Sequence, residues 1–171
     1  MTSKKQSGMI LLILCASVLM AYGCTKAGAG KPAPDFLLQD LSGKEVSLAK
    51  SKGSVVLLDF WATWCAPCLM SIPELVDLQG RYRDRGLVVI GISVDDPSQI
   101  DNKDLLAFKE RLRINYWIVR ADAKVMNDYF SDAQSMAIPT MFIIDRQGKI
   151  VEKRVGFRPG VLEDSLTKVL S

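Results

Sequence analysis

Apolar and polar stretches alternate along most of the chain, and several of the apolar stretches have the character of β-strands. SVVLLDF at 54–60 and LVVIGISV at 87–94 are nearly continuous and rich in β-branched residues, which is typical of strands buried on both faces. TMFIID at 140–145 also reads as a strand. KIVEKRV at 149–155 instead alternates, which predicts antiparallel pairing across a turn at 146–148.

Helical periodicity fills the segments between these strands. Apolar residues recur at helical spacing from Cys68 to about residue 83, although Pro73 should kink that helix because it lacks an N–H. Further helices are predicted at about 101–112, 123–130 and 161–170, with a short strand at 116–119. Two short strands flank a turn at 40–43. This order predicts an α/β sandwich with a mixed central sheet.

The amino terminus has the pattern of an export signal. Lys4 and Lys5 precede an apolar run at 9–22 of about fourteen residues, which is short beside the roughly twenty that span a bilayer. The sequence AYGC at 21–24 then resembles a bacterial lipobox, which would make Cys24 the lipidated residue. An uncleaved membrane anchor and a plain secreted protein remain open as alternatives. All three place the protein outside the cytoplasm, and the first two attach it to a membrane.

The organisation predicted is a signal peptide or anchor at 1–24, a flexible tether at 25–33 and one folded domain at 34–171. The tether is rich in glycine, alanine and proline. The chain carries 22 basic and 19 acidic residues. Without Lys4 and Lys5 the balance is 20 against 19, which gives no electrostatic footprint for nucleic acid. We expect a monomer.

The cysteines are few and their placement is informative. Of the four, Cys15 lies within the apolar run and Cys24 is the candidate lipid site, so the domain keeps only Cys65 and Cys68. A pair that closes so small a loop adds little stability as a staple. Zinc would need two further ligands, and the chain has no histidine. We therefore expect no metal and no cofactor, and favour a redox-active dithiol.

The start of a helix suits such a dithiol. Its first turn presents unpaired N–H groups and the positive end of the helix dipole, so the pKa of the Cys65 thiol should be depressed. Cys68, one turn further on, is placed to attack a mixed disulfide formed on Cys65. Pro67 fits the first helical turn, where its missing N–H is no loss. Asp59 lies on a strand buried on both faces, so desolvation should raise its pKa.

Several separated segments together resemble one family. They are DLSGKEVSL, FWATWCAPC, VVIGISVDD, INYWIVRAD and IPTMFIIDRQGKIV. The pattern is similar to that of the thioredoxin-like TlpA, ResA and CcmG-type thiol-disulfide oxidoreductases, from about residue 34 to the end. The resemblance implies a thioredoxin-like three-layer sandwich with a mixed central sheet and an N-terminal β-hairpin extension. It also implies thiol-disulfide exchange with protein substrates, apocytochrome c being one that the family suggests, and a membrane electron donor.

The resemblance also implies roles for individual residues. Cys65 matches the nucleophile, Cys68 the resolving cysteine and Asp59 the buried acid, which would accept the proton of Cys68. Pro139 matches the family's cis-proline, and Ile138 would offer backbone groups to an extended substrate. Trp64, Ala66 and Pro67 would complete the docking surface around the dithiol.

The residues between the cysteines bear on the direction of the exchange reaction, and two other functions are possible for this fold. Ala66 and Pro67 add no charge that would favour the Cys65 thiolate, which argues against a strong oxidant and for a protein-disulfide reductase. A peroxiredoxin-like peroxidase shares the fold, but it would need its cysteine in a Pro-x-x-x-Thr-x-x-Cys setting, which this sequence lacks. The other rival is a non-enzymatic binding module with an inert dithiol.

Overall fold

The computed structural model describes residues 30–130 and 136–171. The expected signal sequence, the lipobox with Cys24 and most of the expected tether lie outside the described residues. Within the described ranges, no helix has both the length and the apolar character needed to cross a membrane.

A six-stranded sheet forms the middle of the domain, in the order β1-β8-β7-β4-β5-β6. Its central strands are β4 (Val55–Trp61) and β5 (Leu87–Ser93), and both run parallel to β6 (Trp117–Arg120). On the other side of β4, β7 (Thr140–Ile144) and β8 (Lys149–Val155) are antiparallel to their neighbours. The mixed central sheet predicted from the sequence is confirmed.

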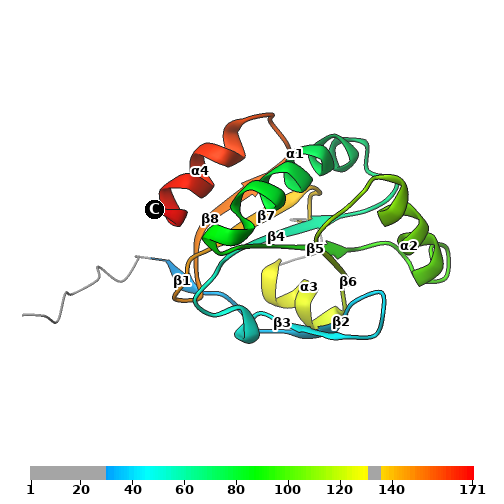
Figure 1. Ribbon diagram of the computed structural model, residues 1–171. Helices are drawn as coiled ribbons and strands as arrows, with labels where there is room; N and C mark the ends of the chain where they lie inside the picture. Colours follow the sequence, from blue (N-terminus) through cyan, green and yellow to red (C-terminus); the bar gives the residue numbers. More distant parts are fainter. Residues whose placement is uncertain (1–29, 131–135) are drawn as a thin grey trace, which may run out of the picture.

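Helices and a small hairpin cover the two faces of this sheet, which makes three layers (Figure 1). One face carries α1 (Ala66–Tyr82), α2 (Asn102–Arg111) and α4 (Val161–Leu170), whose buried residues share one apolar cluster with the sheet. The other face carries α3 (Ala123–Tyr129) and a two-stranded hairpin of β2 (Leu37–Gln39) and β3 (Glu45–Ser47). This is the thioredoxin-like sandwich with an N-terminal hairpin that the resemblance implied.

Polar groups protect the free edge of the sheet. A bridge between Asp40 and Val119 joins the hairpin to β6 at that edge. β6 pairs with β5 only from Ile90 onward, so the first part of β5 is paired with β4 but has no strand on its β6 side. There the side-chain amide of the buried Gln79 takes the place of a strand: its Oε1 accepts from Val89 N at 2.7 Å and its Nε2 donates to the Leu87 carbonyl at 3.1 Å.

Two local details differ from the sequence prediction. Lys31 and Pro32, expected in the tether, form the short strand β1, which pairs with β8. The ordered domain therefore begins before residue 34, because backbone pairing can hold residues whose side chains carry no apolar signal. α1 begins two residues earlier than the apolar periodicity indicated, and Pro73 lies inside it. The remaining short elements are 3₁₀ turns, η1 (Ala49–Ser51) and η2 (Arg83–Arg85).

Candidate active site

Cys65 and Cys68 lie where β4 gives way to α1, and they form a disulfide. Cys65 is the N-cap of α1, and its sulfur accepts a hydrogen bond from Cys68 N at 3.3 Å. A sulfur at this position faces the free N–H groups of the first turn, which favour a thiolate over a thiol once the disulfide is reduced. Cys65 is 5% exposed and Cys68 is fully buried, so a partner reaches Cys65 first.

The loop before β7 lies at the same end of the sheet. The Ile138–Pro139 peptide bond is cis, as the resemblance implied. β7 pairs with β4 so that Thr140 lies opposite Phe60, which brings Pro139 to the end of β4 from which the chain leads to the dithiol. The Pro139 carbonyl accepts from Gly156 N at 2.8 Å, so β8 holds this loop in place. Ile138 is partly buried between the two apolar clusters.

Asp59 lies in the middle of β4, between Gly91 on β5 and Met141 on β7. Because side chains alternate along a strand, Asp59 shares a face with Leu57 and Trp61, and that face packs against the cluster that contains both cysteines. Its side chain is fully buried, and neither carboxyl oxygen has a hydrogen-bond partner among the described residues. Desolvation by burial raises the pKa of Asp59 to about 7. The expected direction of this pKa shift is confirmed.

A rim of exposed side chains surrounds Cys65. Trp64 is 69% exposed, and Ala66 and Pro67 are also exposed. Met70, on the next turn of α1, is 65% exposed. Met70 was not among the site residues expected from the sequence, although its place between the inward positions of an amphipathic helix is a signal that could have found it. The rim can therefore contact apolar groups on a partner that carries a disulfide or a dithiol.

Asp95 is a second buried carboxylate near the dithiol, and it too was not among the site residues expected from the sequence. It is 5% exposed and follows the end of β5. Its oxygens accept from Thr63 N at 3.1 Å, from Thr63 Oγ1 at 2.7 Å and from Ser93 Oγ at 2.9 Å. Thr63 is two residues before Cys65, so these bonds fix the loop that carries the nucleophilic position. The only signal in the sequence was an acidic pair that directly follows an apolar strand.

The fold and this site define the class of protein. A thioredoxin-like sandwich that carries a Cys-x-x-Cys pair at the start of its first long helix, beside a cis-proline, is a thiol-disulfide oxidoreductase. The chain belongs to the AhpC/TSA family, whose sequence model matches residues 29–153, and within it to the thioredoxin-like TlpA, ResA and CcmG-type oxidoreductases.

Individual relatives agree with this assignment. The thiol-disulfide oxidoreductase ResA of Bacillus cereus is 34% identical over 154 residues, which cover 86% of this chain and 84% of that protein. The thioredoxin-like protein YneN of Bacillus subtilis is 34% identical, with 91% and 92% covered. A thiol:disulfide interchange protein of the thioredoxin family from Chlorobium tepidum has a solved structure that matches with a TM-score of 0.74 at 28% identity, covering 83% of this chain and 97% of that one.

Proposed function

We propose that this oxidoreductase is a membrane-attached, extracytoplasmic reductase of protein disulfides, with Cys65 as its nucleophile. The observation that carries the proposal is the position of Cys65 at the N-cap of α1, ahead of a fully buried Cys68. Asp59, buried on the same face of the sheet, is the third member of the proposed machinery.

The proposed reaction has two exchange steps. The Cys65 thiolate attacks one sulfur of a client disulfide, and the other client sulfur leaves as a thiolate, which gives a mixed disulfide. Cys68 then loses its proton to Asp59, directly or through a water, and attacks the Cys65 sulfur. The second client thiolate leaves. The client has gained two electrons, and the protein is left with the Cys65–Cys68 disulfide.

The proposed docking surface combines the cis-proline loop with the exposed rim. Ile138 would offer backbone groups to an extended stretch of client, in the manner of a short added strand, and Pro139 would lie against the dithiol. Trp64, Ala66 and Pro67 would contact the client on the other side of Cys65. We expect the protein to act as a monomer, because one domain supplies every proposed group.

The proposed place of action follows from the amino terminus. Residues 1–24 would act as a lipoprotein-type signal or an uncleaved anchor, with Cys24 lipidated in the first case, and the residues that follow would tether the domain. A membrane electron donor would return two electrons to the disulfide, and apocytochrome c is one client that the resemblance suggests. The reducing direction rests on the uncharged Ala66–Pro67 pair between the cysteines.

The test is to trap the client. In Cys68→Ser the second exchange step is blocked, so we expect mixed disulfides on Cys65 that are released by dithiothreitol. Cys65→Ser is the matched control and should trap nothing. Adducts that form equally in Cys65→Ser would contradict the nucleophile assignment. A reduction potential above about −150 mV would contradict the reducing direction, and rapid consumption of peroxide would favour the peroxidase alternative.

A further inference from the structure

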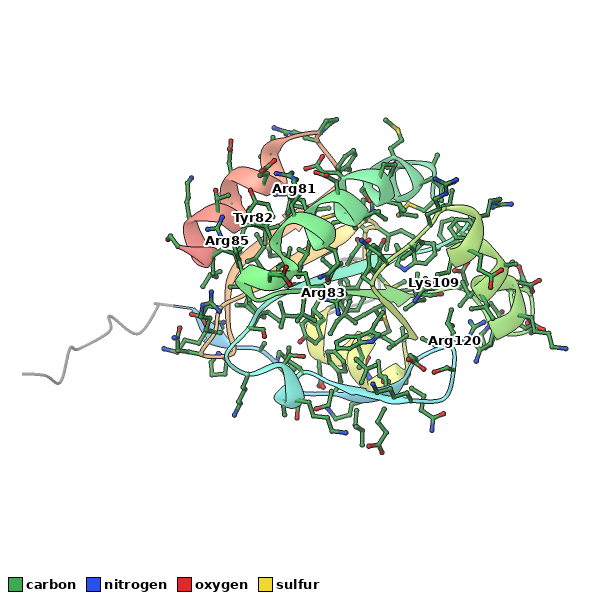
Figure 2. All side chains as sticks on the ribbon, viewed as in Figure 1. Arg81, Tyr82, Arg83, Arg85, Lys109 and Arg120 are labelled. Carbon is green, nitrogen blue, oxygen red and sulfur yellow. A yellow bond between two sulfur atoms is a disulfide. The ribbon has the colours of Figure 1, made fainter. Side chains whose placement is uncertain are left out.

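Basic side chains gather at the end of the sheet that lies opposite the dithiol. The dithiol follows the carboxyl end of β4, so the opposite end is the one where the parallel strands β4, β5 and β6 begin. η2 leads into β5 there and carries Arg83 and Arg85. Lys109 lies in the last turn of α2, which returns to the start of β6. Figure 2 shows Arg83 and Arg85 beyond the end of α1, and Lys109 on α2.

Arg146, at the start of the turn between β7 and β8, links η2 to the segment that leads into β4. Its guanidinium donates to the Gly53 carbonyl at 2.9 Å and to the Arg85 carbonyl at 3.0 Å. A Cβ at Gly86 would lie 2.8 Å from Arg146 Nη1, so the glycine makes room for this contact. Arg146 is thus held against the backbone of η2, while the Arg85 guanidinium lies over the Tyr82 ring.

A cavity of about 400 Å³ opens on the same end, and its lining includes Arg83, Lys109 and Trp117 but no carboxylate. Lys109 Nζ donates to the Tyr116 carbonyl at 2.8 Å, which uses one of its three protons. Burial lowers the pKa of Lys109, a cost that an anion in the cavity would offset. Among the described residues, Arg83 has no ion-pair partner. The Asp40 carboxylate attracts Lys109 from outside the lining, but no carboxylate lines the cavity itself, so its walls are cationic.

The described chain also enters the domain at this end. β1 pairs Lys31 with Ile150 and Pro32 with Lys149, and Ala33 N donates to the Gly148 carbonyl at 2.9 Å. Figure 1 shows β1 beside β8 at the border of the sheet. The turn that carries Arg146 is therefore next to the point from which any attachment through the amino terminus would pull on the domain.

We propose that this basic end rests on an anionic phospholipid surface and that the cavity between Arg83 and Lys109 takes a lipid phosphate. The inference rests on the proposed membrane attachment and adds an orientation to it. Each basic residue near an anionic membrane surface contributes about a fivefold gain in affinity. Contact at this end would place the dithiol at the other end of the sheet from the contacted lipid surface.

The experiment uses the full chain mixed with vesicles of neutral phosphatidylcholine or of phosphatidylcholine with anionic phosphatidylglycerol. Flotation measures attachment, and lysine acylation read by mass spectrometry measures contact. We expect the anionic lipid to protect Lys109 and Lys52, which precedes Gly53, while Lys103 at the other end of α2 stays reactive. The protection should disappear in 1 M salt, where the screening length falls to about 3 Å.

Variants test whether the particular residues matter. Arg83→Gln with Lys109→Gln should weaken the anionic-lipid-dependent protection of Lys52 by about thirtyfold, since two basic residues are lost. Lys103→Gln with Lys124→Gln removes the same charge at the start of α2 and α3 and should leave that protection intact. Equal loss in both pairs would show a net-charge effect and overturn the proposed site.

The outcomes separate this inference from the attachment on which it rests. Flotation with both lipids and equal lysine reactivity in both would overturn the docked orientation and keep the membrane attachment. Flotation with anionic vesicles alone would support the basic surface and contradict the hydrophobic or lipid anchor. Flotation with neither lipid would overturn both.

Discussion

The strand β4 buries side chains of opposite character on the two faces of the central sheet. On the α3 face, Phe60 packs against Tyr129, Phe130 and Phe142 with ring centroids 4.9–5.8 Å apart. On the α1 face, the neighbouring residue Asp59 is equally buried, but within the described part of the chain neither its carboxyl oxygens nor Trp61 Nε1 on the same face has a hydrogen-bond partner. Aromatic packing stabilises a fold, whereas a buried carboxyl without a partner destabilises it.

The difference shows how one strand can serve both stability and chemistry. Alternation sends Phe60 to one face and Asp59 to the other, so the aromatic cluster can offset the cost of the acid without touching it. The acid lies on the face that holds both cysteines. A carboxyl with a pKa near 7 is also the kind of group that can both accept and return a proton at neutral pH.

The largest expected effect comes from the aromatic face. Phe60→Ala should lower the free energy of unfolding of the oxidised protein by about 3–5 kcal/mol, because it removes a fully buried ring and leaves a cavity. Urea denaturation at pH 5 and pH 8 measures this. The loss should be the same at both pH values, since no titrating group is changed. A loss that depends strongly on pH would contradict the idea that the aromatic face stabilises the fold independently of the Asp59 carboxyl on the other face.

For Asp59→Asn we expect the free energy of unfolding to rise instead of fall. The native pKa of about 7 lies above that of an unfolded aspartate, so the native protein holds a proton that the unfolded chain releases. Stability should therefore fall as the pH rises from about 4 to 7 and stay low above that. The variant removes this cost, so it should be more stable than the wild type by about 2–4 kcal/mol at pH 8 and by much less at pH 4.

The same variant should be a poorer reductase. The ionised Asp59 accepts the proton of Cys68 in the proposed second step, so the wild-type rate of that step should rise with pH through about 7. Stopped-flow release of a reduced client from a preformed mixed disulfide measures the rate. In Asp59→Asn the rise should be lost. An unchanged pH profile together with raised stability would leave Asp59 as a buried acid with no part in the exchange.

A smaller effect is expected at the other buried carboxylate. Asp95→Ala would leave Thr63 N, Thr63 Oγ1 and Ser93 Oγ without their acceptor, which should cost about 1–3 kcal/mol of stability. In contrast to Asp59→Asn, this variant should be less stable than the wild type. Thermal unfolding at pH 7 checks the sign. A gain in stability would mean that Asp95, like Asp59, lowers the free energy of unfolding. It would contradict the distinction between a hydrogen-bonded and an unpaired buried acid.

Much of this arrangement could be read from the sequence, because it depends on local patterns. The apolar, β-branched composition of the runs at 54–60 and 87–94 predicted strands buried on both faces, as the structure has them. The Cys-x-x-Cys spacing ahead of a helical pattern predicted that Cys65 and Cys68 lie at the start of a helix. The bond that fixes the active-site loop could not be read, since Thr63 and Asp95 are 32 residues apart and meet only after β4 and β5 pair. β1 was missed for the same reason: its pairing with β8 is made by backbone groups, which leave no pattern in side chains.

The side-chain amide of Gln79 has a consequence for behaviour at high protein concentration. A sheet edge with open N–H and C=O groups is a template on which another chain can add a strand. At the start of β5 those groups, Val89 N and the Leu87 carbonyl, are already bonded to Gln79. The Gln79 amide thus blocks the addition of a strand from another molecule at this part of the edge, which lies at the same end of the domain that we propose to rest on lipid.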